Sequence, residues 1–256
     1  MSVRGMLDGK VVIVTGASSG IGAGAARLFA AEGAAVVLLA RRAHMLEVLV
    51  KEIVAEGGRA TAVAGDVVRP DDVRCAVDTA VDTYGQLDGA FNNAGWATAG
   101  TPLHETEDSV FDQIIDVNLR GVWNCLKYEV PAMLATGGGG SIVNTASVAG
   151  VIATGTASPY IAAKHAVVGL SRAAADEYGQ RGVRVNSLIV GSTRTELMND
   201  VLDEQPELEE PFVARSMQRR MAAPKEVAEA AVWLCSDRSS FVTGAAMAVD
   251  GGWTGR

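Results

Sequence analysis

Tyr160 and Lys164 are four residues apart, a spacing that places both side chains on one face of a helix. A free tyrosine has a pKa of about 10, so it exchanges protons poorly at neutral pH. An ammonium about 4 Å away, at an effective dielectric of about 20, favours the phenolate by about 4 kcal/mol. Because that energy equals about three pKa units, the pair predicts a tyrosine with a lowered pKa. Such a phenol is suited to general acid–base catalysis at an alcohol or carbonyl oxygen.

Ser147 lies just after an apolar run and thirteen residues before the tyrosine. The carboxyl ends of parallel strands are the edge at which α/β sheets bind ligands. A hydroxyl there can hydrogen-bond a substrate oxygen and hold it beside the phenol. A lone serine after a strand is ordinarily a turn residue. The catalytic interpretation therefore depends on its place before Tyr160 and Lys164.

A glycine-rich turn follows the first β-branched run of the chain and precedes a helical pattern. In such a turn backbone N–H groups approach a diphosphate closely, and the helix N-terminus adds a partial positive charge. The T-G-x-x-x-G-x-G spacing differs from the common G-x-G-x-x-G of dinucleotide-binding folds. The sequence predicts a diphosphate site formed by Gly16, Ser18, Ser19, Gly20, Ile21 and Gly22.

This loop resembles the nucleotide loop of the short-chain dehydrogenase/reductase family, and further motifs of that family follow in the same order. The resemblance covers essentially the whole chain and is to the short, single-domain branch. It implies a seven-stranded sheet in the order 3-2-1-4-5-6-7. It also implies hydride transfer between a nicotinamide cofactor and a secondary alcohol or ketone. The further motifs are Asn92–Gly95, Asn118–Gly121, Ser147, Tyr160 with Lys164, and Thr243–Gly252.

The resemblance assigns a role to each residue of the catalytic set. Tyr160 would be the general acid or base, Lys164 would lower its pKa and hold the cofactor ribose, and Ser147 would position the substrate oxygen. Asn118 would hold a water that relays protons to Lys164. An amide that interrupts an apolar helical pattern can instead bond the backbone and distort the helix, and this alternative stays open.

The resemblance also implies contacts for the rest of the cofactor. Val190-Gly191 stands where the family usually has Pro-Gly, which leaves the path of the following residues open. Besides Tyr160 and Lys164, the implied contacts are Asp66 and Val67 at the adenine, Asn93, Ala94 and Gly95 along the ribose and nicotinamide, and Thr193 and Thr195 at the nicotinamide amide and diphosphate.

The residues after the second β-branched run bear on the choice of cofactor. An acidic residue there would bind the ribose 2′-hydroxyl and repel a 2′-phosphate, but the chain has Ala40. Arg41 and Arg42 follow at a helix start, where positive charge is unfavourable unless an anion binds. We expect Arg41, and secondarily Arg42, to face the 2′-phosphate of NADP(H). Solvated surface arginines and an NAD(H) enzyme are the alternative, since Ser19 stands where many NADP-using relatives have a basic residue.

Short apolar runs alternate with amphipathic segments of helical length along the chain. Continuous apolar strands alternating with helices predict a parallel sheet covered on both faces. With right-handed crossovers this gives a doubly wound α/β sandwich of the Rossmann type. The expected strands are 11–14, 35–39, 60–64, 87–91, 141–145, 183–189 and 246–249, and the expected helices are 20–32, 43–56, 70–84, 107–134, 159–180 and 225–235.

Residues 191–224 break this alternation, with charged residues mixed among large apolar ones and no strand pattern. Long connections in compact domains are often lids over a binding site. We expect one domain over 1–256 with this segment as a substrate loop; an ordinary surface excursion with short helices is the alternative. The predicted substrate pocket is mostly apolar and comprises Ser147, Tyr160, Trp96, Val148, Leu197 and Met198. Trp96 would equally well cap the core.

Composition excludes several classes of protein. The chain has 22 basic and 30 acidic residues, a net charge of −8 and 48% hydrophobic residues, which excludes disordered and collagen-like chains. Net acidity without a Lys/Arg block disfavours nucleic acid and anionic membranes as partners. Neither a run of 18 apolar residues nor a signal-like start is present. We expect a cytoplasmic enzyme that acts on a small molecule.

Three cysteines far apart predict reduced thiols, and three histidines without metal-ligand spacing predict metal-free chemistry. A small-residue face along 162–173 permits close helix packing, and the resemblance implies a homotetramer paired through this helix. Packing within one chain would explain that face equally well.

Two other functions stay open. The same phenol–ammonium pair could serve an epimerase or dehydratase that keeps its cofactor bound, although no substantial C-terminal substrate domain follows. A non-catalytic, NAD(P)-responsive regulatory protein could also use this fold, but it would have no need for Ser147, Tyr160 and Lys164 together.

Overall fold

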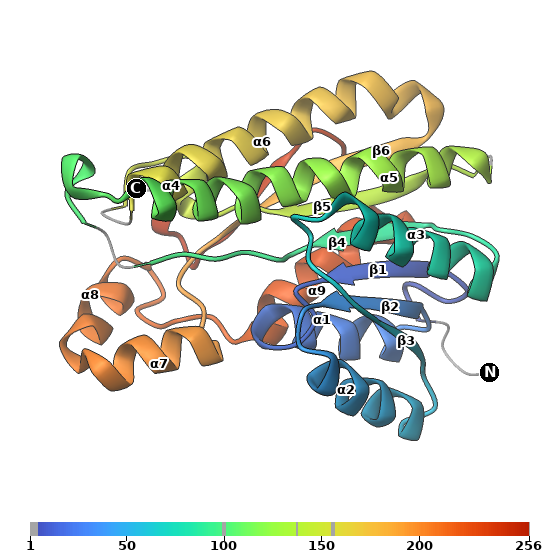
Figure 1. Ribbon diagram of the computed structural model, residues 1–256, viewed down its shortest axis with the longest axis horizontal. Helices are drawn as coiled ribbons and strands as arrows, with labels where there is room; N and C mark the ends of the chain where they lie inside the picture. The colour runs from blue at the N-terminus through green and yellow to red at the C-terminus, as the bar shows by residue number, and fades with distance from the viewer. Residues whose placement is uncertain (1–4, 99–100, 137, 155–156, 256) are drawn as a thin grey trace.

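A parallel sheet of seven strands, in the order β3-β2-β1-β4-β5-β6-β7, forms the centre of the protein (Figure 1). The computed structural model describes residues 5–98, 101–136, 138–154 and 157–255, without the side chains of residues 197, 201 and 204. All neighbouring strands pair in parallel, which confirms the expected order and the doubly wound topology. The strands are β1 (Val11–Thr15), β2 (Ala35–Ala40), β3 (Arg59–Ala64), β4 (Gly89–Asn92), β5 (Gly140–Thr145), β6 (Val183–Val190) and β7 (Ala246–Val249).

Helices cover both faces of this sheet, with α3, α5 and α6 on one side and α1, α2 and α9 on the other (Figure 1). Val11 and Ile13 of β1 belong to one core cluster, whereas Val12 and Val14 belong to the other. Successive strand residues point to opposite faces, so a continuous apolar strand fills two cores at once. The helices are α1 (Gly20–Ala31), α2 (Ala43–Ala55), α3 (Pro70–Tyr84), α4 (Asp108–Ile115), α5 (Gly121–Ala135), α6 (Ser158–Tyr178), α7 (Glu196–Glu204), α8 (Glu209–Ala214) and α9 (Pro224–Cys235).

The helix expected over 107–134 is divided into α4, a π-helical turn at Asp116–Arg120 and α5. Asn118 lies in this turn, and its Nδ2 donates to the carbonyl oxygen of Ile114 at 3.0 Å. A side-chain amide that bonds the carbonyl four residues earlier competes with the backbone ladder. Helical turns of this type occur often at functional sites. Asn118 therefore bonds the backbone within a distorted turn of this helix, a contact that is compatible with either role.

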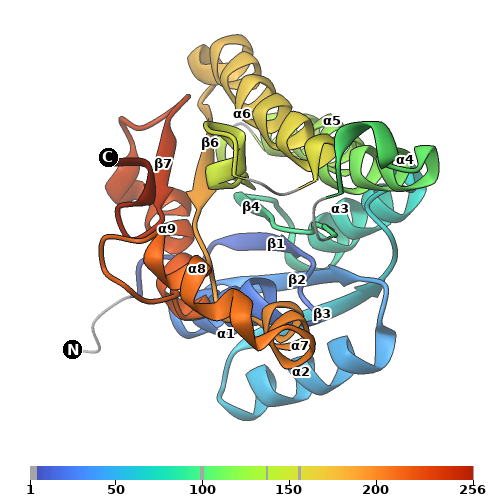
Figure 2. The same cartoon turned by 90° about the vertical axis from the view of Figure 1, so that its left-hand side faces the viewer.

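Residues 191–224 contain the two short helices α7 and α8, which lie beyond the carboxyl ends of the strands (Figure 2). Leu202 and Met221 are each only 7% exposed, so this segment buries part of its apolar surface. The guanidinium of Arg215 lies 5.5 Å from the ring centroid of Phe212 and 5.2 Å from that of Trp253. These contacts tie α8 to the C-terminal part of the chain.

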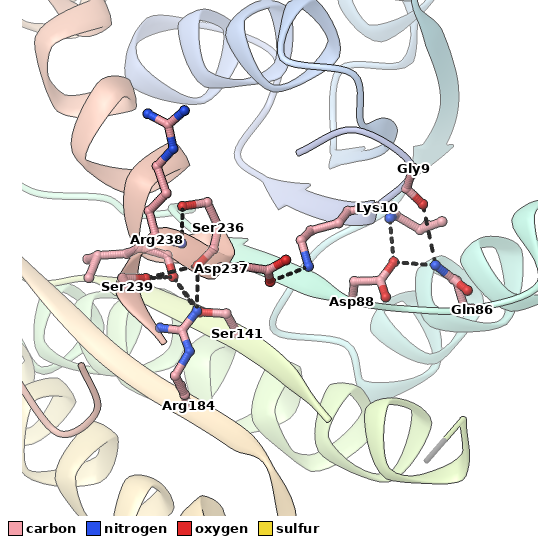
Figure 3. A network of polar contacts seen from close by, with 12 residues as sticks. Gly9, Lys10, Gln86, Asp88, Ser141, Arg184, Ser236, Asp237, Arg238 and Ser239 are labelled. Carbon is pink, nitrogen blue, oxygen red and sulfur yellow. Dashed lines mark hydrogen bonds and ion pairs between the residues drawn. The ribbon is translucent and has the colours of Figure 1, made fainter. Parts of the chain in front are cut away.

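At the opposite end of the sheet, Arg184 of β6 closes the C-terminus of α9 (Figure 3). Its Nη2 donates to the carbonyl oxygens of Leu234 at 2.8 Å and Ser236 at 3.1 Å. Its Nη1 donates to the carbonyl oxygen of Val242 at 3.1 Å. The last carbonyls of a helix have no partner within the helix, and a cation there also opposes the negative end of the helix dipole. Arg184 thereby joins β6, α9 and the segment before β7.

We expect Arg184→Met to lower the free energy of unfolding by about 2 kcal/mol, because several charge-assisted hydrogen bonds are lost together. For a domain of this size the loss corresponds to a fall in Tm of about 4–8 °C. Differential scanning calorimetry measures it. Arg238→Met is the control, since this exposed arginine lies in the same corner and points away from the carbonyls (Figure 3). Equal changes in both variants would contradict the capping role.

The cysteines lie in helices and carry free thiols, with Cys75 exposed and Cys125 and Cys235 buried. Burial raises the pKa of Cys235 to about 12 and that of Cys125 well above its ordinary value, so both remain thiols at neutral pH. In the described ranges, no group of three or more His, Cys, Asp or Glu residues is placed to hold a metal ion. No helix in those ranges is long and apolar enough to cross a membrane.

Candidate active site

Ser147, Tyr160 and Lys164 come together beyond the carboxyl end of β5. Ser147 follows the strand and begins a short 3-10 turn, where its Oγ accepts a hydrogen bond from the N–H of Ala149 at 3.1 Å. Tyr160 and Lys164 lie on successive turns of α6, with the lysine Nζ 5.5 Å from the tyrosine ring centroid. The Ser147 side chain interacts with the Tyr160 phenol. The structure thus brings together the three residues that sequence spacing selected.

Lys164 is 2% exposed, and its Nζ donates to the carbonyl oxygen of Thr145 at 2.9 Å. Burial lowers the pKa of Lys164 to about 8, so the amine stays mostly protonated at pH 7. A Cβ atom at Gly95 would lie 3.7 Å from this Nζ and 3.1 Å from Oδ1 of Asn118. Gly95 therefore leaves the space in which the lysine and the asparagine approach the turn after β4.

The prediction that Tyr160 has a lowered pKa is wrong in this structure. Burial raises the pKa of Tyr160, and the interaction with Ser147 lowers it without reversing that effect. The prediction assumed an ammonium about 4 Å from the phenol, whereas Lys164 lies over the ring and also bonds the Thr145 carbonyl. Tyr160 is consequently a protonated phenol at neutral pH, the state needed to donate a proton to a substrate oxygen.

Asn118 is fully buried and holds the chain that follows the turn after β4. Its Nδ2 donates to the carbonyl oxygen of Trp96 at 2.6 Å, and its Oδ1 accepts from the Trp96 N–H at 3.3 Å. Together with the bond to Ile114, these contacts fix the π-helical turn against the residues beside Lys164. Its role in a proton relay stays a prediction.

The glycine loop is packed so closely that side chains have no room at two of its positions. A Cβ at Gly16, where φ is +66°, would lie 2.9 Å from Cα of Ala94. A Cβ at Gly22 would lie 2.2 Å from the carbonyl oxygen of Gly16. The loop therefore presents its backbone between β1 and α1, with Ile21 packed against the core. Backbone N–H groups at a helix N-terminus in this arrangement suit a diphosphate.

The first N–H group of α1 already donates to an anionic partner from a distant part of the chain. The N–H of Gly20 donates to Oε2 of Glu196 at 2.7 Å. The loop and helix end thus fit a negatively charged group, as the phosphates of a dinucleotide require. Glu196 was not among the predicted site residues, since its only signal in the sequence is an acidic residue within the irregular segment 191–224.

Arg42, rather than Arg41, reaches the glycine loop. The Nη2 atom of Arg42 donates to Oγ of Ser18 at 3.0 Å and to Oγ of Ser19 at 2.6 Å. Arg41 is exposed, and no hydrogen bond of its side chain is found among the described residues. Which of the two arginines faces a 2′-phosphate stays a prediction, and this geometry favours Arg42. Arg42 is held at the start of α2, where its side chain turns toward β1.

Two threonines that were not among the predicted site residues connect the ends of neighbouring strands. Oγ1 of Thr15 accepts hydrogen bonds from the N–H groups of both Asn93 and Ala94 at 3.0 Å. Oγ1 of Thr145 donates to Oδ1 of Asn93 at 3.5 Å. The signal in the sequence that could have identified Thr15 and Thr145 is a threonine at the end of an apolar strand. These bonds hold the turn after β4 between the glycine loop and Lys164.

The remaining predicted cofactor residues also lie at strand ends. The loop after β3 is held from α5, because Nδ2 of Asn124 donates to the carbonyl oxygens of Val67 at 2.9 Å and Val68 at 3.2 Å. Oδ1 of Asp66 accepts from the N–H of Val68 at 3.1 Å. After β6, Thr193 is buried and its Oγ1 donates to the Gly191 carbonyl, whereas Oγ1 of Thr195 accepts from the N–H of Met198.

The predicted substrate residues differ in where the structure places them. Trp96 and Tyr160 both pack against the small apolar cluster of Ile114, Ala157 and Ala163. Met198 is partly buried at the start of α7. Val148 is only 4% exposed and packs in the main core, which argues against direct contact with a substrate. The side chain of Leu197 lies outside the described residues.

Comparisons with known proteins agree over almost the whole chain. A family model described as "Enoyl-(Acyl carrier protein) reductase" matches residues 16–254. The chain is 51% identical to an A-factor type gamma-butyrolactone 1'-reductase of Streptomyces virginiae, covering 98% of each chain. It is 44% identical to a 2,5-dichloro-2,5-cyclohexadiene-1,4-diol dehydrogenase of Sphingobium indicum, covering 97% of this chain and 98% of the relative.

Among solved structures, carveol dehydrogenase from Mycobacterium avium in complex with NAD superimposes with a TM-score of 0.92 at 33% identity, covering 98% of this chain and 100% of that one. The fold, the order of motifs and the convergence of Ser147, Tyr160 and Lys164 agree with these relatives. The chain therefore belongs to the short-chain dehydrogenase/reductase family, as a nicotinamide-dependent oxidoreductase that acts on CH–OH groups.

Proposed function

We propose that this enzyme interconverts a secondary alcohol and a ketone carried on or beside a ring, with NADP(H) as its favoured cofactor. The convergence of Ser147, Tyr160 and Lys164 next to the glycine loop carries the proposal. The ring preference is supported by the names of two relatives, a butyrolactone reductase and a cyclohexadiene-diol dehydrogenase. The apolar cluster beside Tyr160, with Trp96, is suited to the face of such a ring.

When bound, the nicotinamide ring supplies or accepts the hydride. The residues of this chain handle the proton and the oxygen. Ser147 holds the substrate oxygen, and in the reductive direction the O–H bond of Tyr160 breaks as its proton passes to that oxygen. The phenolate left behind lies near the ammonium of Lys164, which the Thr145 carbonyl holds in place. Opposite charge nearby favours the phenolate, so Lys164 acts after the proton has left.

The preference for NADP(H) is supported by the position of Arg42. Its guanidinium lies over the hydroxyls of Ser18 and Ser19. A 2′-phosphate next to it would gain charge-assisted hydrogen bonds. Ala40, 8% exposed at the end of β2, supplies no carboxylate that would repel such a phosphate. NAD(H) is the alternative, and the carveol dehydrogenase structure contains NAD.

We expect Arg42→Ala to weaken NADPH binding by about tenfold to a hundredfold, because hydrogen bonds to a charged group contribute about 1.5–3 kcal/mol. NADH binding should change less than about threefold, since NADH has no 2′-phosphate. Fluorescence titration of both reduced cofactors measures the ratio. Arg41→Ala is the matched control and should leave both dissociation constants nearly unchanged. An equal loss for both cofactors, or a larger loss in the Arg41 variant, would contradict the assignment of Arg42.

The substrate class is tested by following cofactor absorbance with matched ketones. The panel contains cyclohexanone, γ-butyrolactones that carry a ketone, open-chain ketones of equal carbon number, and an enoyl thioester. A pocket built for a ring should give kcat/KM at least about tenfold higher for the cyclic members, because a misfitting apolar group costs about 1–3 kcal/mol. Equal values for cyclic and open-chain ketones would contradict the ring preference. Turnover of the enoyl thioester and of none of the ketones would indicate reduction of a carbon–carbon double bond in place of the proposed reaction.

The proposal includes one domain over 1–256, residues 191–224 as a substrate loop, a cytoplasmic location and a homotetramer. The small residues Ala162, Gly169 and Ala173 of α6 are exposed within the described part of the chain. Trp123 on α5 is 50% exposed. Close packing of α5 and α6 against a second copy would cover these positions and supports the oligomer. Analytical ultracentrifugation measures its size.

A further inference from the structure

The start of α7 is seated on the glycine loop. Oε2 of Glu196 accepts the hydrogen bond from the Gly20 N–H at 2.7 Å. A Cβ at Gly20 would lie 3.1 Å from Cγ2 of Thr195, so the residue before Glu196 is also in close contact with the loop. The two contacts join segments that are 176 positions apart in sequence.

The N-terminus of α1 has no other acidic partner among the described residues. Its first turn contains no acidic residue, and its N-cap Ser19 makes no side-chain capping bond. The hydroxyl of Ser19 instead accepts from Arg42. The positive end of a helix attracts a negative group. Glu196 supplies that group from a different part of the chain.

The diphosphate of a nicotinamide dinucleotide would need the same place. The Gly20 N–H cannot donate a full hydrogen bond to Glu196 and to a phosphate oxygen at once, and two anions at this site repel each other. We propose that Glu196 is an internal competitor of the cofactor diphosphate: its carboxylate holds the start of α7 against the glycine loop, and cofactor binding displaces it. This inference depends on the proposed placement of the diphosphate at that loop.

Displacement of Glu196 also changes the position of the proposed substrate loop. Thr195 caps α7, because its Oγ1 accepts from the Met198 N–H at 3.2 Å and its carbonyl oxygen accepts from the Asn199 N–H at 2.8 Å. The first turn of α7 therefore moves with Thr195 and Glu196, and Met198 of the proposed pocket moves with it. Cofactor binding and the shape of the substrate pocket are coupled through this one carboxylate.

Glu196→Gln removes the negative charge and keeps the size of the side chain. We expect it to tighten NADPH binding by about three- to fivefold, the upper part of the range for an exposed charged contact. Asp200→Asn is the matched control, since it removes the same charge from an exposed residue on the same helix. Its dissociation constant should stay within about twofold of the wild-type value. Equilibrium fluorescence titration gives both values without turnover.

Two fragments of the cofactor locate the effect. ADP-ribose contains the diphosphate and should bind more tightly to the Glu196→Gln variant by a similar factor. Adenosine 2′-monophosphate has no diphosphate and should bind both proteins equally. Thermal unfolding without cofactor provides a further readout, because loss of the negative charge at the Gly20 N–H should lower Tm slightly in this variant and not in Asp200→Asn.

Unchanged or weaker NADPH binding by Glu196→Gln would overturn the inference, as would equal tightening in Asp200→Asn, which would indicate net charge alone. These outcomes differ from failure of the proposed function. If the wild-type protein bound neither NADPH nor NADH, cofactor placement itself would be wrong. If the wild-type protein bound a cofactor and Glu196→Gln did not strengthen it, only the competition by Glu196 would be wrong.

Discussion

Replacing Tyr160 with phenylalanine is expected to lower kcat by about a hundredfold to ten-thousandfold, because a positioned acid or base contributes about 10²–10⁴ to the rate. The ring contacts the cluster of Trp96 and Ile114, and phenylalanine preserves those contacts. The dissociation constant for the cofactor should therefore change less than about twofold. Steady-state rates and fluorescence titration measure the two quantities on the same preparation.

Tyr178→Phe is the control for this prediction. Tyr178 ends the same helix, α6, and is partly buried against the main core, far along the chain from the catalytic residues. It should retain nearly full activity. A Tyr160→Phe enzyme that kept more than about a tenth of the wild-type rate would contradict the acid–base role. Parallel loss of activity and of cofactor binding would indicate that Tyr160 serves the structure instead.

Glu129→Gln is expected to stabilise the protein at pH 8 by about 2–3 kcal/mol. Glu129 lies on α5 with no exposed surface, and its Oε2 accepts from Nδ2 of Asn92 at 2.9 Å. Oε1 of Glu129 and Oδ1 of Asn92 are both buried, and neither has a hydrogen-bond partner in the described part of the chain. A glutamine at this position carries no charge. Its side-chain amide supplies an N–H group that can donate a hydrogen bond to Oδ1 of Asn92.

The pH dependence of this effect follows from the pKa of Glu129. Burial raises it from 4.5 to about 7, against the opposing effect of the bond from Asn92. Below pH 4.5 the carboxyl is neutral in both the folded and the unfolded chain. Between pH 4.5 and 7 the unfolded chain ionises first, so stability falls as pH rises. Above pH 7 the loss reaches its full value, about 3 kcal/mol for 2.5 pKa units.

Chemical denaturation at pH 5 and pH 8 tests this. The gain from Glu129→Gln should be below about 1 kcal/mol at pH 5 and largest at pH 8. Glu177→Gln, at an exposed position of α6, should change neither value appreciably. Destabilisation by Glu129→Gln of equal size at both pH values would show that the carboxylate is stabilised in the folded protein.

Much of the fold could be predicted because its determinants are local. Apolar runs of strand length predicted the first and last residue of each strand to within about two positions. β4 begins at Gly89 rather than residue 87, because the side chain of Asp88 accepts a hydrogen bond from the Val11 N–H. The convergence of Tyr160 and Lys164 was also local, since helical spacing alone places them on one face.

The features that sequence missed depend on contacts between distant segments or on burial. The bond of Glu196 to Gly20 joins the first residues of α1 and α7, and only the folded chain shows that Arg42 and not Arg41 reaches the glycine loop. The direction of the pKa shift of Tyr160 was wrong because helical spacing reveals a neighbouring charge but not the loss of water around a phenol.

Hydride transfer itself is measured most directly by isotope labelling. The enzyme is mixed with NADPH carrying deuterium at both C4 positions of the nicotinamide and with the best cyclic ketone of the panel. The product alcohol should contain one deuterium on its carbinol carbon for each cofactor oxidised. Tight cofactor binding without any transfer of label, or a changed substrate with the cofactor still reduced, would contradict an alcohol dehydrogenase. The first result would favour a regulatory protein, and the second an epimerase or dehydratase.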